Sequence, residues 1–104
     1  MQEVLDKISS IIDTYEGGEW KSKDSLREML RELTSSNYHL TKFNIEAYQE
    51  HNTVQFKHKG SVASGKILAD EKVPELRMIR KIMEAVDHVI WSMRSELSII
   101  KKES

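Results

Sequence analysis

Apolar residues recur along most of this chain at spacings of three and four, the period of an amphipathic helix. The first stripe ends just before the glycine pair Gly17-Gly18, and glycine commonly terminates helices. Its members are Val4, Leu5, Ile8, Ile11, Ile12 and Tyr15. The pattern predicts a short N-terminal helix, with Trp20 in the following connection packed back onto the stripe.

A second helix is predicted to open at Asp24 or Ser25, because Ser25 and Glu28 have the spacing of a capping box. The stretch Thr34–Asn37 is poor helix sequence, since short polar side chains compete for backbone hydrogen bonds. A seam with 4-3-4-3 spacing nevertheless runs straight through it. The seam consists of Met29, Leu33, Ser36, Leu40, Phe43, Ala47, Glu50 and Val54. We therefore predict one long helix.

Residues 43–67 allow a second interpretation. Phe43, Ile45 and Ala47 alternate with polar residues, and so do Val54, Phe56 and His58. Alternation is the period of a strand. An α+β fold, with a hairpin turning near residues 50–52, is therefore the alternative to an all-α fold.

The turn Lys59-Gly60 precedes Ser61, which we expect to cap a helix that begins at Val62. Several small residues follow, including Gly65 and Ala69, so a neighbouring backbone can approach this segment closely. Pro74 is expected either to kink this helix or to lie in the first turn of the next one.

The strongest pattern lies in the last third of the chain, where apolar residues keep an unbroken heptad spacing typical of a coiled coil or bundle. This heptad seam consists of Leu76, Ile79, Met83, Val86, Ile90, Met93, Leu97 and Ile100. A second stripe, formed by Met78, Ile82, Ala85, Val89 and Ile99, lies beside it. The combined face is too wide for one partner helix, so we predict a homo-oligomer with the heptad seam at its interface. The alternative is that the first helix covers the second stripe within one chain.

These elements together predict a single all-α domain over residues 1–104: a long helical hairpin, a short N-terminal helix and a C-terminal coiled-coil or bundle seam. The composition agrees, because charged residues make up 32% of the chain while Gly (4) and Pro (1) are scarce. The net charge of −1 gives no global attraction to nucleic acid or membrane, so any such binding requires a local patch.

The chain has no Cys, which excludes thiolate metal sites and suits a reducing cytoplasm. We expect a cytoplasmic protein with no membrane partner, because there is no signal-peptide pattern and no apolar run of about 20 residues.

Glu84 and His88 have the spacing of helical metal ligands, but they lack a second such pair. Nucleophile and phosphate-loop motifs are also missing. We predict no catalytic residue, no metal, no cofactor and no enzymatic activity. His51 is expected to be a partly buried polar residue of the second helix.

Basic residues gather in two places. Lys57 and Lys59 lie close to Phe56, with Lys66 one to two helical turns further on, and a second cluster contains Arg77, Arg80 and Lys81. Basic side chains beside an aromatic ring hold single-stranded nucleic acid through phosphate contacts and stacking. A ring of subunits would repeat such a patch and add multivalency. An ordinary mixed-charge surface is the other interpretation.

Two segments resemble a group of small helical bacteriophage proteins similar to the phage recombination mediator, which helps to load a recombinase onto single-stranded DNA. The first is Lys59-Gly60-Ser61-Val62-Ala63-Ser64, followed by Ala69, Val73 and Leu76. The second is Ser92-Met93-Arg94-Ser95-Glu96-Leu97, which leads into Lys101-Lys102-Glu103. The resemblance spans about residues 40–103. It implies a helical fold, ring-like homo-oligomers, and contacts with single-stranded DNA and partner proteins.

If the resemblance transfers, Lys57, Lys59, Lys66 and Arg77 are the positions expected to touch phosphates. The near-neutral net charge of the chain does not agree with strong binding to DNA.

The first functional hypothesis is a non-enzymatic phage accessory protein that oligomerises in the host cytoplasm and acts in DNA recombination or replication. The second is an inhibitor or adaptor that binds a phage or host protein, for example one that blocks a host defence complex.

Overall fold

The computed structural model describes residues 1–18, 20 and 22–103, with side chains as far as Ile100. This part of the chain forms four helices: α1 (Gln2–Glu16), α2 (Lys23–Lys57), α3 (Val62–Lys72) and α4 (Glu75–Glu103). The predicted all-α fold is confirmed. The alternative hairpin is wrong, because residues 43–57 continue α2, residues 62–67 open α3, and no strand occurs in the described residues. The side chains of Lys101 and Lys102, which belong to the resemblance, lie outside the described part.

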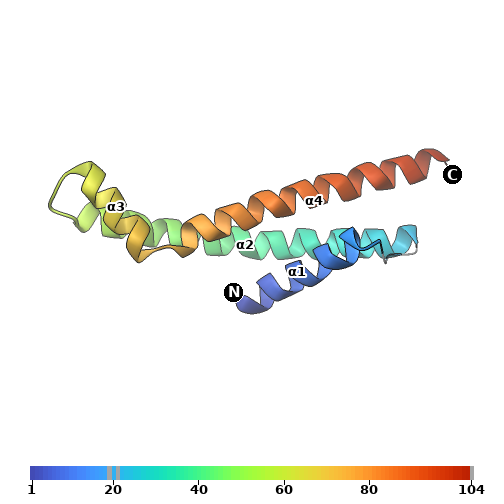
Figure 1. Cartoon of the computed structure of the whole chain (residues 1–104), viewed down its shortest axis with the longest axis horizontal. Coiled ribbons are helices and arrows are strands. Elements are labelled where there is room, and N and C mark those ends of the chain that lie inside the picture. The colour runs from blue at the N-terminus through green and yellow to red at the C-terminus, as the bar shows by residue number, and fades with distance from the viewer. Residues whose placement is uncertain (19, 21, 104) are drawn as a thin grey trace.

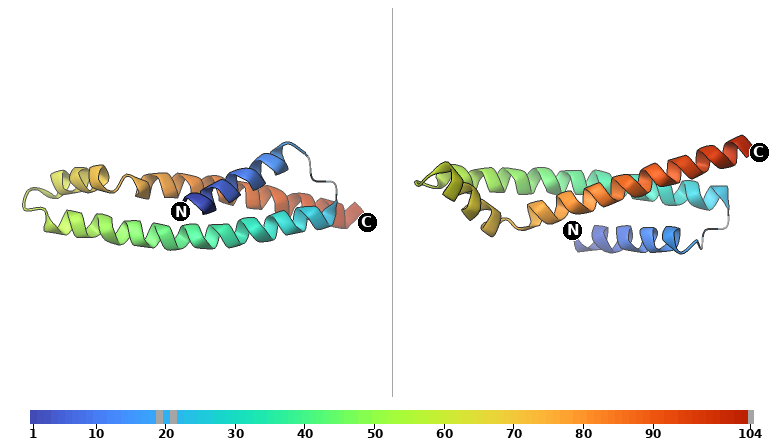
Figure 2. Two further views of the ribbon diagram at one scale, coloured as in Figure 1. Left: turned by 90° about the horizontal axis from the view of Figure 1, so that it is seen from below. Right: turned by 45° about the horizontal axis from the view of Figure 1, so that its top comes forward.

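The helices form an elongated body of 62 × 25 × 19 Å (Figure 1). Helices α2 and α4 run antiparallel as a long hairpin. Figure 2 shows α1 alongside the N-terminal half of α2, whereas α3 folds back at the opposite end of the hairpin. The two ends are called the α1 end and the α3 end below. None of the described helices combines the length and the apolar character that crossing a bilayer requires.

Helix α2 runs through its polar stretch without a break, as predicted. Threonine hydroxyls along it donate to the carbonyl one turn earlier, as Thr34 does to Leu30 O (2.7 Å) and Thr41 does to Asn37 O (3.0 Å). These hydroxyls are therefore satisfied inside the helix instead of disrupting it. The helix begins one or two residues earlier than predicted, at Lys23. Ser22, not Ser25, is the N-cap, and its hydroxyl accepts from the backbone N–H of Ser25 at 3.1 Å.

The larger of two apolar cores lies at the α1 end, where three helices meet. Its buried members are Ile8, Ile11, Leu26, Leu33, Leu40, Val86, Ile90 and Met93. Trp20 packs on this core as predicted, with its ring stacked on Tyr15 at 6.2 Å between centroids. The Tyr15 hydroxyl donates to Glu96 Oε1 of α4 at 3.0 Å, which ties α1 to α4.

The heptad seam of α4 faces the inside of the single chain. Leu76, Ile79, Val86, Ile90 and Met93 are buried, and Met83, Leu97 and Ile100 are partly buried against the same cores. The structure therefore places five of the eight residues inside the single chain, where they are not available to a second copy, and the association of copies stays a prediction. The physical reason is that α2 supplies a complementary seam in the same chain. Of the second stripe, Ile82 and Val89 pack on the α1-end core, whereas Met78 and Ile99 are exposed.

Helix α3 is short and is held close to α2. Ser61 caps it as predicted, accepting from the backbone N–H of Ser64 at 3.1 Å. Gly65 is buried, and a Cβ atom at this position would lie 3.4 Å from the Gln55 carbonyl oxygen and 3.3 Å from His58 Cδ2. Gly65 therefore marks a close approach of α3 to the end of α2, as the sequence suggested, and a Cβ atom here would require a small shift of the His58 ring. Pro74 lies between α3 and α4, and the smaller core, formed by Ala47, Val73, Leu76 and Ile79, packs beneath this junction.

Candidate nucleic-acid interface

A groove with a volume of about 710 Å³ lies at the α3 end, where α2, α3 and α4 converge. Helix α2 contributes one wall, α3 another, and the first three turns of α4 the third. The lining residues are Tyr48, His51, Asn52, Gln55, Lys66, Asp70, Val73, Pro74, Leu76, Arg77, Arg80, Lys81 and Glu84. Most of them are polar or charged, in contrast to the apolar core at the α1 end.

Four cations line this groove: Lys66 from α3, and Arg77, Arg80 and Lys81 from α4. The groove has two carboxylates, Asp70 and Glu84. Among the described side chains, none of the four cations has a carboxylate oxygen within 4.0 Å. Positive charge therefore exceeds negative charge in the groove, and no ion pair with a described residue holds these side chains. An anion can bind them without first breaking a salt bridge.

Arg80 is also paired with an aromatic ring. Its guanidinium carbon lies 5.6 Å from the centre of the Tyr48 ring, a cation–π contact between α4 and α2. The Tyr48 side chain is half-exposed at the wall of the groove. A half-exposed ring beside a guanidinium offers a flat surface for stacking next to a donor for phosphate.

His51 and Asp70 join α2 to α3 inside the groove. His51 is only 8% exposed, and its Nε2–H donates to Asp70 Oδ1 at 2.7 Å. This hydrogen bond is the main cause that lowers the pKa of Asp70 below its usual value, with Arg77 and Lys66 contributing through their positive charge. Burial of His51 agrees with the sequence prediction. Its partner was not predicted, because it lies 19 residues away on a helix that must first fold back.

The structure separates the four residues predicted to bind nucleic acid into two pairs. Lys66 and Arg77 line the groove, as do Arg80 and Lys81 of the second basic cluster. Lys57 and Lys59 are exposed where α2 leads into α3, and they do not line the groove. Sequence reasoning missed Tyr48. Its spacing of three from His51 places it beside that residue on α2, which is the signal that was available.

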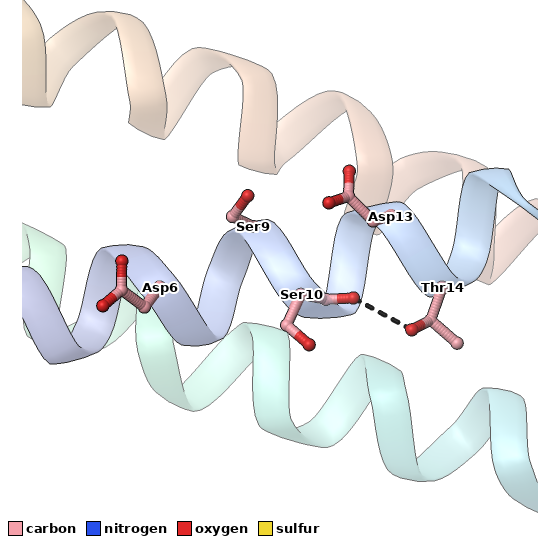
Figure 3. A pocket seen from close by; sticks show the side chains of 5 residues that line it. All are labelled: Asp6, Ser9, Ser10, Asp13 and Thr14. Carbon is pink, nitrogen blue, oxygen red and sulfur yellow. Dashed lines mark hydrogen bonds between the residues drawn. The ribbon is translucent and has the colours of Figure 1, made fainter.

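A second hollow, of about 400 Å³, lies on the surface of α1 and has the opposite charge. Its lining residues are Asp6, Ser9, Ser10, Asp13 and Thr14 (Figure 3). All five belong to α1, and the Thr14 hydroxyl donates to the Ser10 carbonyl oxygen at 3.0 Å. With two carboxylates and no cation among the lining residues, this hollow repels phosphate.

Glu84 and His88, the pair with metal-ligand spacing, are both exposed on α4. In the described part of the chain, no group of three or more His, Asp or Glu side chains is arranged to hold a metal ion. Comparison with protein-family models, with curated proteins and with solved structures finds no match to this chain.

Proposed function

We propose that this protein is a non-enzymatic accessory factor that binds single-stranded DNA in the groove at the α3 end. We further propose that it works as a homo-oligomer in phage DNA recombination or replication. The observation that carries the proposal is a groove in which four cations from α3 and α4, none of them in an ion pair with a described side chain, meet the Tyr48 ring. Phosphates are attracted by such cations, and an unpaired base can stack on such a ring.

Single-stranded DNA is favoured over duplex as the ligand for a structural reason. The groove has an aromatic wall, and in a duplex the faces of the bases are stacked on one another and cannot reach such a ring. One groove with four cations gives only modest affinity, because the whole chain carries a net charge of −1. Several copies on one strand would raise the apparent affinity by multivalency. This is why assembly forms part of the proposal.

Contacts between copies would mainly involve residues outside the heptad seam, since five of its eight residues are buried within the chain. Exposed apolar side chains on the two long helices offer such positions. The largest is Trp91, which is 70% exposed on α4. Exposed aromatic residues are common anchors of protein interfaces.

Fluorescence anisotropy of a labelled oligo-dT, titrated with protein at several salt concentrations, tests DNA binding directly. The groove variant carries Arg77→Ala, Arg80→Ala and Lys81→Ala. We expect its affinity to fall at least about tenfold at low salt, and its salt dependence to lose about two units of slope. The fold of the variant is expected to remain intact, because all three residues are exposed and surface substitutions of this kind change stability little.

The control carries Arg27→Ala and Arg31→Ala on α2, at the far end of the molecule, and removes two positive charges where the groove variant removes three. These arginines are also exposed, and each is 3.5 to 4.0 Å from a carboxylate of its own helix. We expect the control to bind DNA like the wild type. Equal losses in both variants would show a diffuse charge effect and would contradict binding in the groove.

A protein-binding inhibitor or adaptor is the second candidate, supported by aromatic side chains that remain in solvent. Phe56 is 88% exposed near the end of α2, in addition to Trp91 on α4. A wild-type protein that ignores oligo-dT at low salt, and whose capture of a host protein depends on Trp91 and Phe56, would favour this candidate.

A further inference from the structure

Asp70 opposes the charge of the groove in which it lies. It belongs to α3, one helical turn after Lys66, and it lines the groove together with Arg77 of α4. Its side chain is partly exposed, so an incoming anion would meet it directly. A carboxylate next to phosphate-binding cations repels phosphate and also offers those cations a competing partner.

The carboxylate cannot easily turn away, because a buried residue holds it. His51 Nε2–H donates to Asp70 Oδ1 at 2.7 Å, and His51 itself is fixed in the interface between α2 and α3. A surface carboxylate without such a partner would swing into solvent when a phosphate arrived. The negative charge of Asp70 is therefore a fixed part of the groove.

We propose that Asp70 is a built-in counter-charge that limits how tightly the groove holds phosphate groups. This role rests on the proposed function of the groove, and it makes Asp70 the residue that sets the affinity of the groove for phosphate. The hydrogen bond from His51 lowers the pKa of Asp70, and the positive charges of Arg77 and Lys66 lower it further, so the carboxylate is ionised in the groove at neutral pH.

The test variant is Asp70→Asn, which removes the charge but keeps an oxygen that can accept from His51. The matched control is Glu71→Gln, which removes the same charge from the neighbouring exposed position of α3, outside the groove. The first probe is immobilised heparin, a polyanion that reports anion affinity whatever the natural ligand is. The second probe is labelled oligo-dT.

We expect Asp70→Asn to elute from heparin at higher salt than both the wild type and Glu71→Gln. We expect it to bind oligo-dT roughly three- to tenfold more tightly, the effect of one partly screened charge close to the ligand. Equal elution of the two variants, earlier elution of Asp70→Asn, or no retention of any of the proteins would overturn the inference. Stronger retention on heparin without any binding of oligo-dT would support the role of Asp70 and refute the proposed single-stranded DNA function.

A second variant separates charge from a displacement of α3. His51→Gln keeps a side-chain donor and leaves the charge of Asp70 in place, but it weakens the contact that holds α3. Because a less firmly held Asp70 can turn partly away from a phosphate, we expect its elution from heparin at pH 7.5 to fall between that of the wild type and that of Asp70→Asn. If His51→Gln eluted as late as Asp70→Asn, the effect would come from movement of α3, and the counter-charge role would be wrong.

Discussion

The two ends of the α2–α4 hairpin are built in different ways. At the α1 end, a third helix covers the hairpin, and large apolar side chains such as Leu33 and Met93 are fully buried. At the α3 end, the core is small, and a hydrogen-bonded His51–Asp70 pair lies next to a groove lined with cations. Burial of large side chains supplies most folding free energy. The α1 end is therefore the stabilising part of the molecule, and the α3 end is the part free to carry a ligand site.

The same difference appears in how each outer helix is attached. Helix α1 contributes buried Ile8 and Ile11 to the core, whereas α3 contributes the small residues Gly65 and Ala69. Small residues allow close approach but bury little apolar surface. Helix α3 consequently depends on its Ser61 cap and on the His51–Asp70 hydrogen bond, and we expect it to be the first helix to open.

The largest effect is expected from Ile90→Asp at the α1 end. Ile90 is 8% exposed in the core, and a carboxylate placed there loses its hydration without gaining a partner. We expect the free energy of unfolding to fall by more than about 3 kcal/mol. Thermal melting followed by circular dichroism measures this. Ile99→Asp is the matched control, because Ile99 lies on the same helix and is 55% exposed. If both variants melted like the wild type, the assignment of the core would be wrong.

A smaller and local effect is expected from Ser61→Ala at the α3 end. This substitution removes the hydroxyl that accepts from the backbone N–H of Ser64, at a cost of about 1 kcal/mol. Hydrogen exchange should become faster in α3, while the amides of the α1 end keep their protection. Ser98→Ala, at an exposed position of α4 with no capping role, serves as the control. Equal loss of protection at both ends would show that the molecule opens as one unit.

The smallest effect is expected from acid. Because the pKa of Asp70 is lower in the folded chain than its usual value, the ionised form stabilises the fold. This contribution is fully present above about pH 4 and is lost as the pH falls through the lowered pKa. The difference in melting temperature between wild type and Asp70→Asn should therefore be constant near neutral pH and shrink in acid. A difference that grew in acid would mean that Asp70 opposes folding.

The helices could be predicted from the sequence because their apolar spacing is regular. The heptad seam of α4 corresponds to a buried face, and so does the long seam of α2 through Ser36, except at Glu50, which is exposed while its neighbour His51 is buried. The strand alternative arose from Ile45 and Phe56, whose alternation with polar residues suggested burial. Both side chains are in fact exposed, so the alternation came from apolar residues on the outer face of α2.

The site was harder to predict than the helices. Lys66 and Arg77 could be chosen from their charge, but their position in one groove depends on how α3 folds back onto α2. The same tertiary contact brings His51 to Asp70. The heptad seam was assigned to a contact between copies because spacing identifies an apolar face but not the helix that covers it. Here α2 of the same chain covers much of that face.

Mapping of oligo-dT binding by backbone amide NMR chemical shifts would test the division of the molecule into a stabilising end and a binding end. We predict that the shifts change at the groove, around Lys66, Asp70 and residues 77–81, and that the amides of α1 remain unaffected. Changes centred on α1, or changes spread evenly along α2 and α4, would contradict a binding site at the α3 end.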